Sequence, residues 1–198
     1  TTGGGLLDEK GPNGGFEHQN GCGTGTWIDS SDTNLMSDLA CRADVGTGGA
    51  SIEMPLLMAK RSVQDRITDG TNGAFLRDDA LLATVMITDE DDQSNTMDGT
   101  KVPITGLAPD WNPADEVTFF DTLKGNRTRW AAAVIAGESD CESGLGSAVE
   151  ATRLKEFVTD ANGNSTQAVF SSICDGDLSI GLQKALDTFQ DACGNVIE

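Results

Sequence analysis

The chain has 198 residues, of which 32 are acidic and 13 basic, for a formal net charge of −19. An acidic excess of this size argues against binding to nucleic acid or to anionic membrane surfaces, and it is compatible with binding cations. No apolar run approaches the roughly 20 residues that a helix needs to cross a bilayer, so we expect no membrane span.

The cysteines are scattered and form no C-x-x-C pair, which argues against a zinc knuckle or a thioredoxin motif. Such spacing is typical of disulfides in an oxidising compartment. It predicts a secreted, extracellular or cell-surface protein, with the periplasm as an alternative; buried free thiols in a cytosolic protein are the competing interpretation. The count is odd, so one thiol stays free or bonds to another chain: Cys22, Cys41, Cys141, Cys174 and Cys193.

Residues 1–50 are rich in glycine and small polar residues and show almost no apolar periodicity. We expect a long loop region there, separate from a domain over residues 51–198. A disulfide between Cys22 and Cys41 would close a loop of about twenty residues and stabilise it by about 3 kcal/mol.

Regular structure is predicted from Ser51 onward. Apolar residues recur at helical spacing from Ile52 to Ile67, with Pro55 in the first turn and Gly70 as a stop signal. The next segment, Ala80 to Thr88, is continuously apolar and predicts a strand buried on both faces, as in a parallel sheet.

Helices and strands then alternate to the end of the chain. Asn112 and Pro113 predict a helix start and Gly125 its end. The remaining expected elements are a strand at 130–136, a helix at 149–158, a strand at 168–173 and a helix at 178–189. The alternation predicts an α/β fold, with a three-layer, doubly wound and mostly parallel sheet.

The strand at 80–88 ends in a run of acids, and ligands of open parallel sheets bind beyond the carboxyl ends of the strands. Asp89, with Asp91 and Asp92, is therefore a candidate site for Mg²⁺ or Ca²⁺, which prefer oxygen ligands. A plain solvated acidic loop is the alternative.

The segment Asn72 to Ser94, NGAFLRDDALLATVMITDEDDQS, resembles a strand-and-loop signature of von Willebrand factor A-like proteins of the type found in secreted myxobacterial proteins. Weaker similarity extends to VGTGGASIEMPL at 45–56, to residues 130–137 and to FSSICDGDL at 170–178. Together the segments cover most of residues 40–190.

The resemblance implies a divalent cation held by three loops. Asp89 matches the aspartate of the third loop, whereas Ala50 stands where the second loop has a threonine, so Thr47 or Ser51 would have to replace it. The Asp-x-Ser-x-Ser pattern of the first loop is absent before Val45.

By the same resemblance, Thr1 lies just after the third strand of the family's sheet. We therefore expect an N-terminal fragment or a second chain to complete the sheet, separated by processing before Thr1; the alternative is that residues 1–50 hold strands of their own. Cys141 and Cys174 would tie the loops at two adjacent strand ends, which leaves Cys193 for the missing part. A Cys174–Cys193 bond is the main competitor.

No enzyme motif is present. His18 is the single histidine, and G-x-S-x-G, H-E-x-x-H and phosphate-loop patterns are all missing from the sequence. We therefore predict a non-enzymatic extracellular binding or adhesion module, which binds a protein or cell-surface ligand through a cation near Asp89. The alternatives are a structural subunit of a cell-surface filament or coat with a degenerate metal site, and an accessory chain of a processed secreted enzyme.

Overall fold

The computed structural model describes residues 14–16, 22–23, 25–44, 53–94, 112–163 and 165–196. The chain forms two compact units, Thr1–Arg77 and Asp78–Glu198, and each is described by itself. The sequence separated residues 1–50 from the rest on composition, whereas the boundary between the compact units falls between Arg77 and Asp78.

The first unit contains a helix, α1 (Leu35–Ala43), within the region expected to be loop. None of its residues is buried, and its apolar side chains Leu35, Met36 and Leu39 are exposed. Two constraints hold it instead. Cys41 is bonded to Cys22, as expected, and the Arg42 guanidinium donates hydrogen bonds of 2.9–3.0 Å to the carbonyls of Cys22, Gly25 and Thr26.

The helix expected between residues 52 and 67 is divided at Gln64 into α2 (Pro55–Val63) and α3 (Asp65–Thr68). Asn72 follows and is fully buried. Its side-chain amide donates to the carbonyls of Gly14 and Ser62, and its side-chain oxygen accepts from the N–H of Phe16, each at 2.9 Å. This one side chain therefore joins three segments of the first unit.

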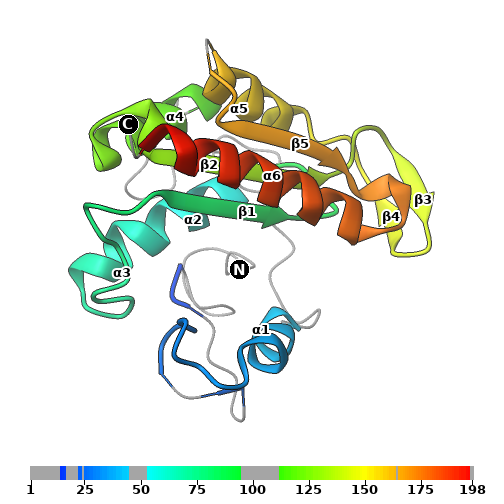
Figure 1. The fold of residues 1–198 in the computed structure, drawn as a ribbon. Coiled ribbons are helices and arrows are strands. Elements are labelled where there is room, and N and C mark those ends of the chain that lie inside the picture. Colours follow the sequence, from blue (N-terminus) through cyan, green and yellow to red (C-terminus); the bar gives the residue numbers. More distant parts are fainter. Residues whose placement is uncertain are drawn as a thin grey trace. The chain divides into compact units, whose positions relative to one another are not determined.

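The second unit is mixed α/β, with a parallel sheet in the order β1-β2-β5 (Figure 1). Its strands are β1 (Leu82–Ile87), β2 (Trp130–Ala136) and β5 (Ala168–Ser172). The sequence predicted all three strands and their parallel arrangement.

The helices are α4 (Pro113–Lys124), α5 (Thr152–Asn162) and α6 (Leu178–Val196), with short helices η1 (Arg127–Arg129) and η2 (Ile173–Asp175). The expected start of α4 is confirmed by a capping box, in which Asn112 accepts from Ala114 N–H and Asp115 accepts from Asn112 N–H. A short hairpin, β3 (Cys141–Ser143) and β4 (Gly146–Ala148), was not predicted.

The helices lie on both faces of the sheet. On one face, Gly181 of α6 packs so closely on β2 that a Cβ there would lie 2.7 Å from Ile135 Cδ1. On the other face, the Trp130 ring packs between Phe120 of α4 and Phe157 of α5, with centroid distances of 5.1 and 6.2 Å. Figure 1 shows α6 in front of the strands. Within the described residues, no helix is both long and apolar enough to cross a membrane.

The expectation that the first strand is buried on both faces was wrong. In β1, Leu82 and Met86 are buried, but Ala83, Val85 and Ile87 are exposed. The central strand β2 is buried throughout. The difference arises because β1 is an edge strand of the described sheet, and α6 packs on β2 and β5 instead.

A polar cluster beside Trp130 fastens α4 and α5 to the sheet. The Asp121 carboxylate accepts two hydrogen bonds of 2.6 Å from Arg127 and one of 2.8 Å from the indole N–H of Trp130. Arg127 also donates to the carbonyls of Asp160 and Ala161 at the end of α5. Burial acts to raise the pKa of Asp121, but these hydrogen bonds outweigh it and hold the pKa below its usual value.

A lowered pKa in the folded state means that Asp121 stabilises the fold above the pKa of the unfolded chain, about 3.9, and that this contribution is lost as the pH falls through the lower folded value. We predict that Asp121→Asn lowers the free energy of unfolding at pH 7 and makes its decline between about pH 4 and pH 2 shallower than in the wild type. Urea unfolding followed by circular dichroism across this range measures both effects. If the free energy of unfolding of the two proteins fell in parallel with pH, a lowered pKa of Asp121 in the folded state would be contradicted.

Candidate functional site

The acidic segment expected to bind a cation lies at the carboxyl end of β1. Thr88 continues the ladder, with its N–H donating to Ile135 O at 3.1 Å. Its hydroxyl then accepts from Glu90 N–H at 3.1 Å and turns the chain out of the sheet. The acids therefore follow a fixed turn at the edge of the sheet.

The Asp91 carboxylate is already hydrogen-bonded within the fold. Its carboxylate accepts from the N–H groups of Arg153 at 3.0 Å and Leu154 at 3.3 Å, the first turn of α5. The residue at the N-cap position of that helix is Ala151, whose side chain cannot cap it. Asp91 supplies the missing cap from far along the sequence, and its negative charge suits the positive end of the helix dipole.

Asp92 is also occupied. It is buried, and its carboxylate accepts from Ser94 N–H at 3.1 Å and Ser94 Oγ at 2.6 Å. Arg153 Nε lies 3.6 Å away as an ion-pair partner. The two acids that seemed to extend the cation site therefore hold the loop against α5.

Asp89 differs from both. Its side chain is exposed, and among the described residues neither a hydrogen bond nor an ion pair engages its carboxylate. Only its backbone carbonyl is fixed, by Val149 N–H at 2.9 Å. Of the three predicted acids, Asp89 is exposed, Asp91 is half-buried and Asp92 is buried.

The other predicted ligands, Thr47 and Ser51, lie outside the described residues, as does His18. Within the described ranges, no three acidic, histidine or cysteine side chains come together as a metal ion would require. Of the predicted ligands, the described residues thus offer the free carboxylate of Asp89, and one carboxylate by itself does not make a Mg²⁺ or Ca²⁺ site.

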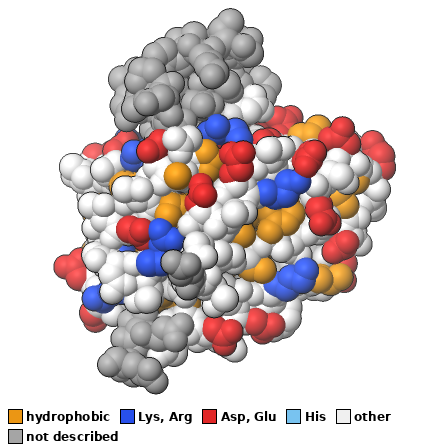
Figure 2. All heavy atoms as spheres, turned by 90° about the horizontal axis from the view of Figure 1, so that it is seen from above, with side chains coloured by type: hydrophobic (Ala, Val, Ile, Leu, Met, Phe, Trp, Pro, Cys, Tyr) orange, Lys and Arg blue, Asp and Glu red, His pale blue; other side chains and the backbone are white. Residues whose placement is uncertain are grey.

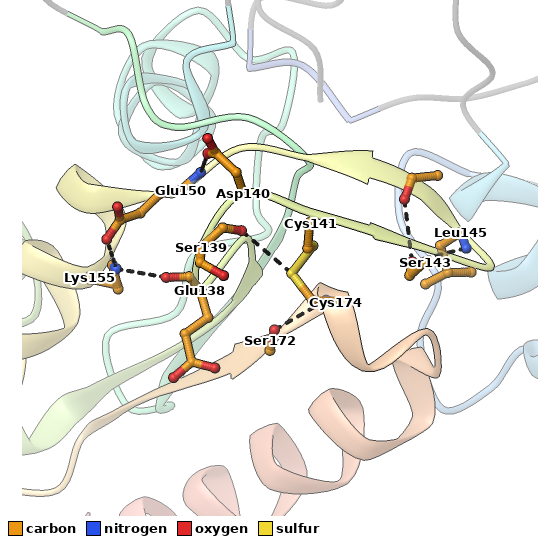
Figure 3. Close-up of a disulfide and its surroundings, with 11 residues drawn as sticks. Glu138, Ser139, Asp140, Cys141, Ser143, Leu145, Glu150, Lys155, Ser172 and Cys174 are labelled. Carbon is orange, nitrogen blue, oxygen red and sulfur yellow. Dashed lines mark hydrogen bonds and ion pairs between the residues drawn. A yellow bond between two sulfur atoms is a disulfide. The ribbon is translucent and has the colours of Figure 1, made fainter.

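The β3–β4 hairpin stands beside Asp89 and is braced at its base (Figure 3). Cys141 at its start is bonded to Cys174 in η2, as expected from the sequence, with the two Cα atoms 5.9 Å apart. The end of the hairpin is fixed by two hydrogen bonds of 2.9 Å. Val149 N–H donates to the backbone carbonyl of Asp89, and Ala151 N–H donates to the carbonyl of Gly137. A side chain at Gly137 would overlap the Val149 carbonyl oxygen, so this crossing requires glycine.

The hairpin carries exposed apolar and acidic side chains together. Leu145 at its turn and Val149 at its exit are exposed. Four exposed acidic residues lie on the hairpin and its flanks: Glu138, Asp140, Glu142 and Glu150. Of these four, Glu150 forms an ion pair, with Lys155. In the face shown in Figure 2, acidic side chains are likewise spread widely, with smaller basic and hydrophobic patches between them.

A polar groove of about 460 Å³ lies between the start of α4 and α5. It is lined by Asn112, Pro113, Glu150, Thr152, Lys155, Glu156, Thr159 and Asp160. The lining combines two threonine hydroxyls, one lysine and three carboxylates. The prediction that the chain is not an enzyme stays a prediction.

Comparison with known proteins finds no family model that matches the chain, and no significant match among curated proteins or solved structures. The similarity to von Willebrand factor A-like proteins therefore rests on the sequence segments quoted above.

The structure separates the roles of the neighbouring acids, and mutation can measure the difference. We predict that Asp91→Ala lowers the free energy of unfolding by about 0.5–2 kcal/mol, because it removes the cap of α5. The matched change Asp89→Ala should stay within about 0.5 kcal/mol of the wild type, because it removes no contact. Urea denaturation of both variants is the measurement; equal losses would show that Asp91 does not act as the cap.

Proposed function

We propose that the chain is an extracellular binding module of the von Willebrand factor A-like type, and that its ligand surface is the carboxyl edge of the sheet. The observation that supports this best is the pairing of a braced, exposed hairpin with the free carboxylate of Asp89. Rigid loops at this edge are the usual place for ligand sites on parallel sheets.

The chemistry of the surface indicates the class of ligand. Leu145 and Val149 offer apolar contact, and exposed carboxylates lie on the same hairpin and its flanks. A folded protein or cell-surface ligand with an apolar pocket and basic or cation-bearing surroundings would match both features. The two disulfides are compatible with a secreted protein.

A divalent cation, Mg²⁺ or Ca²⁺, is part of this proposal. Asp89 would be one ligand. Bound there, the cation would offer an open coordination position to an acidic group on the partner. The carboxylates of Asp91 and Asp92 already accept hydrogen bonds within the fold, so Asp89 is the ligand that we propose.

The test is calorimetric titration of the purified chain with CaCl₂ and, separately, with MgCl₂. We expect saturable binding that Asp89→Asn weakens at least tenfold. The control is Asp79→Asn: Asp79 is also exposed and lies near the opposite end of β1, so its loss should leave binding unchanged. Absence of binding, or equal binding by both variants, would reject the cation.

A second candidate function is a structural subunit of a cell-surface filament or coat in which the metal site is degenerate. The engagement of Asp91 and Asp92 in helix capping and loop packing favours it. In that case the chain would assemble equally well in EDTA and in Ca²⁺, as light scattering can show. Assembly or ligand binding that EDTA abolishes would favour the first proposal.

A further inference from the structure

The second unit exposes large apolar side chains on one face of its sheet. On β1, Val85 is 41% exposed and Ile87 48%; on α6, Leu182 is 41% exposed and Leu186 55%. Isolated exposed apolar residues are common, but a contiguous group of them marks an interaction surface. The register of the sheet shows whether these four form such a group.

Val85 and Ile87 lie on the α6 face. Neighbouring residues of paired strands point to the same side, and Val85 pairs with Ala133 and Ile87 with Ile135. Ile135 is the side chain that Gly181 of α6 packs against. The exposed side chains of β1 therefore continue the layer that α6 covers over β2.

The exposed leucines lie on the flank of α6 that faces β1. Ala185 of α6 is buried. The neighbouring Lys184 donates a hydrogen bond of 3.3 Å to Ser171 Oγ on β5, so the flank of α6 that carries Lys184 lies over β5. At about 100° per residue, Leu182 and Leu186 lie on the opposite side of Ala185. In Figure 1, α6 runs between β1 and β5, in agreement with this orientation.

The leucines belong to a longer stripe on α6. Leu182, Leu186, Phe189 and Cys193 follow at spacings of four, three and four, the pattern of a helix that packs on another helix. Cys193 is exposed and free, whereas the other four cysteines are paired. The stripe therefore ends at a thiol that is available to a neighbour.

The backbone of β1 is also open on its outer side. Thr88 N–H points to β2, so the N–H groups of Ala83, Val85 and Ile87 point away from it. Leu82–Ile87 contains no proline or charged residue, the usual means of blocking an edge strand. Among the described residues, no strand pairs with this edge.

We propose that this surface, formed by Ala83, Val85 and Ile87 of β1 and by Leu182, Leu186 and Phe189 of α6, is the docking site for a strand–helix segment of a second, different polypeptide. The partner strand pairs with the free edge of β1. The partner helix covers Val85 and Ile87 and packs on the stripe of α6. Cys193 lies within reach of that helix.

Charge argues for a different polypeptide rather than a second copy of this chain. Each copy carries a formal net charge of −19. Joining two such surfaces edge to edge would bring like charges together, which opposes association. A partner of neutral or basic charge meets no such repulsion. The proposal does not depend on a cation at Asp89, which lies at the carboxyl end of the sheet.

The experiment places a photo-crosslinking amino acid, p-benzoylphenylalanine, at Val85 or at Leu182 in the full chain, expressed in its native host. A third variant carries it at Glu156, which is exposed on α5, the helix of the opposite face. We expect both test positions to crosslink the same short segment of one other polypeptide, at least tenfold more than the Glu156 control. Mass spectrometry of the crosslinked peptides identifies the segment.

A double variant, Val85→Lys with Leu182→Lys, tests the surface without probing the core, because both side chains are exposed. We expect its circular dichroism and melting temperature to match the wild type, and crosslinking from position 87 to fall at least tenfold. The matched control, Glu156→Lys on the opposite face, should leave crosslinking unchanged.

Crosslinks between copies of this chain would assign the surface to self-association and overturn the proposal. Crosslinks at the level of the Glu156 control would overturn it as well. Neither result would affect the calorimetric test at Asp89, so the two proposals fail separately.

Discussion

The second unit depends on the packing of Trp130 at the start of its central strand. The ring is buried between Phe120 and Phe157, and its N–H is held by Asp121. Arg127 lies 5.3 Å above the ring and ties the same carboxylate to the end of α5. Because aromatic contacts and charge-assisted hydrogen bonds converge here, both helices of this face are fixed relative to β2.

The geometry at the carboxyl edge of the sheet depends on that packing. With α5 fixed, its first turn stands where Asp91 can cap it, and this contact sets the path of the acidic segment after β1. The residues after the hairpin are hydrogen-bonded to the carbonyls of Gly137 and Asp89, and the Cys141–Cys174 disulfide joins the hairpin to η2. A core contact at one end of β2 is thus linked, through α5, to the surface at the other end that we propose binds the ligand.

The sequence predicted the elements better than it predicted their surroundings. The runs at Leu82–Ile87 and Trp130–Ala136 both indicated strands, but an apolar run does not tell a central strand from an edge strand, so the exposure of Val85 was missed. Helix α1 was missed although its apolar residues, Leu35, Met36, Leu39, Ala40 and Ala43, recur at helical spacing. The hairpin was missed because its strands are three residues each, although Gly144 and Gly146 between Cys141 and Val149 were a turn signal. Which carboxylate is free could not be predicted from the sequence. The hydrogen-bond donors to Asp91, Arg153 and Leu154, lie far along the chain, and Asp92 is buried only in the folded protein.

We propose two separate surfaces on the second unit: a braced carboxyl edge that binds a ligand and an open β1 edge that pairs with a partner. Amide hydrogen exchange along β1 tests this account most directly, comparing the recombinant chain alone with material purified without reduction from its native source. The account predicts that the amides of Ala83, Val85 and Ile87 exchange rapidly in the isolated chain and at least a hundredfold more slowly in the native material. Equal, rapid exchange in both preparations would contradict it.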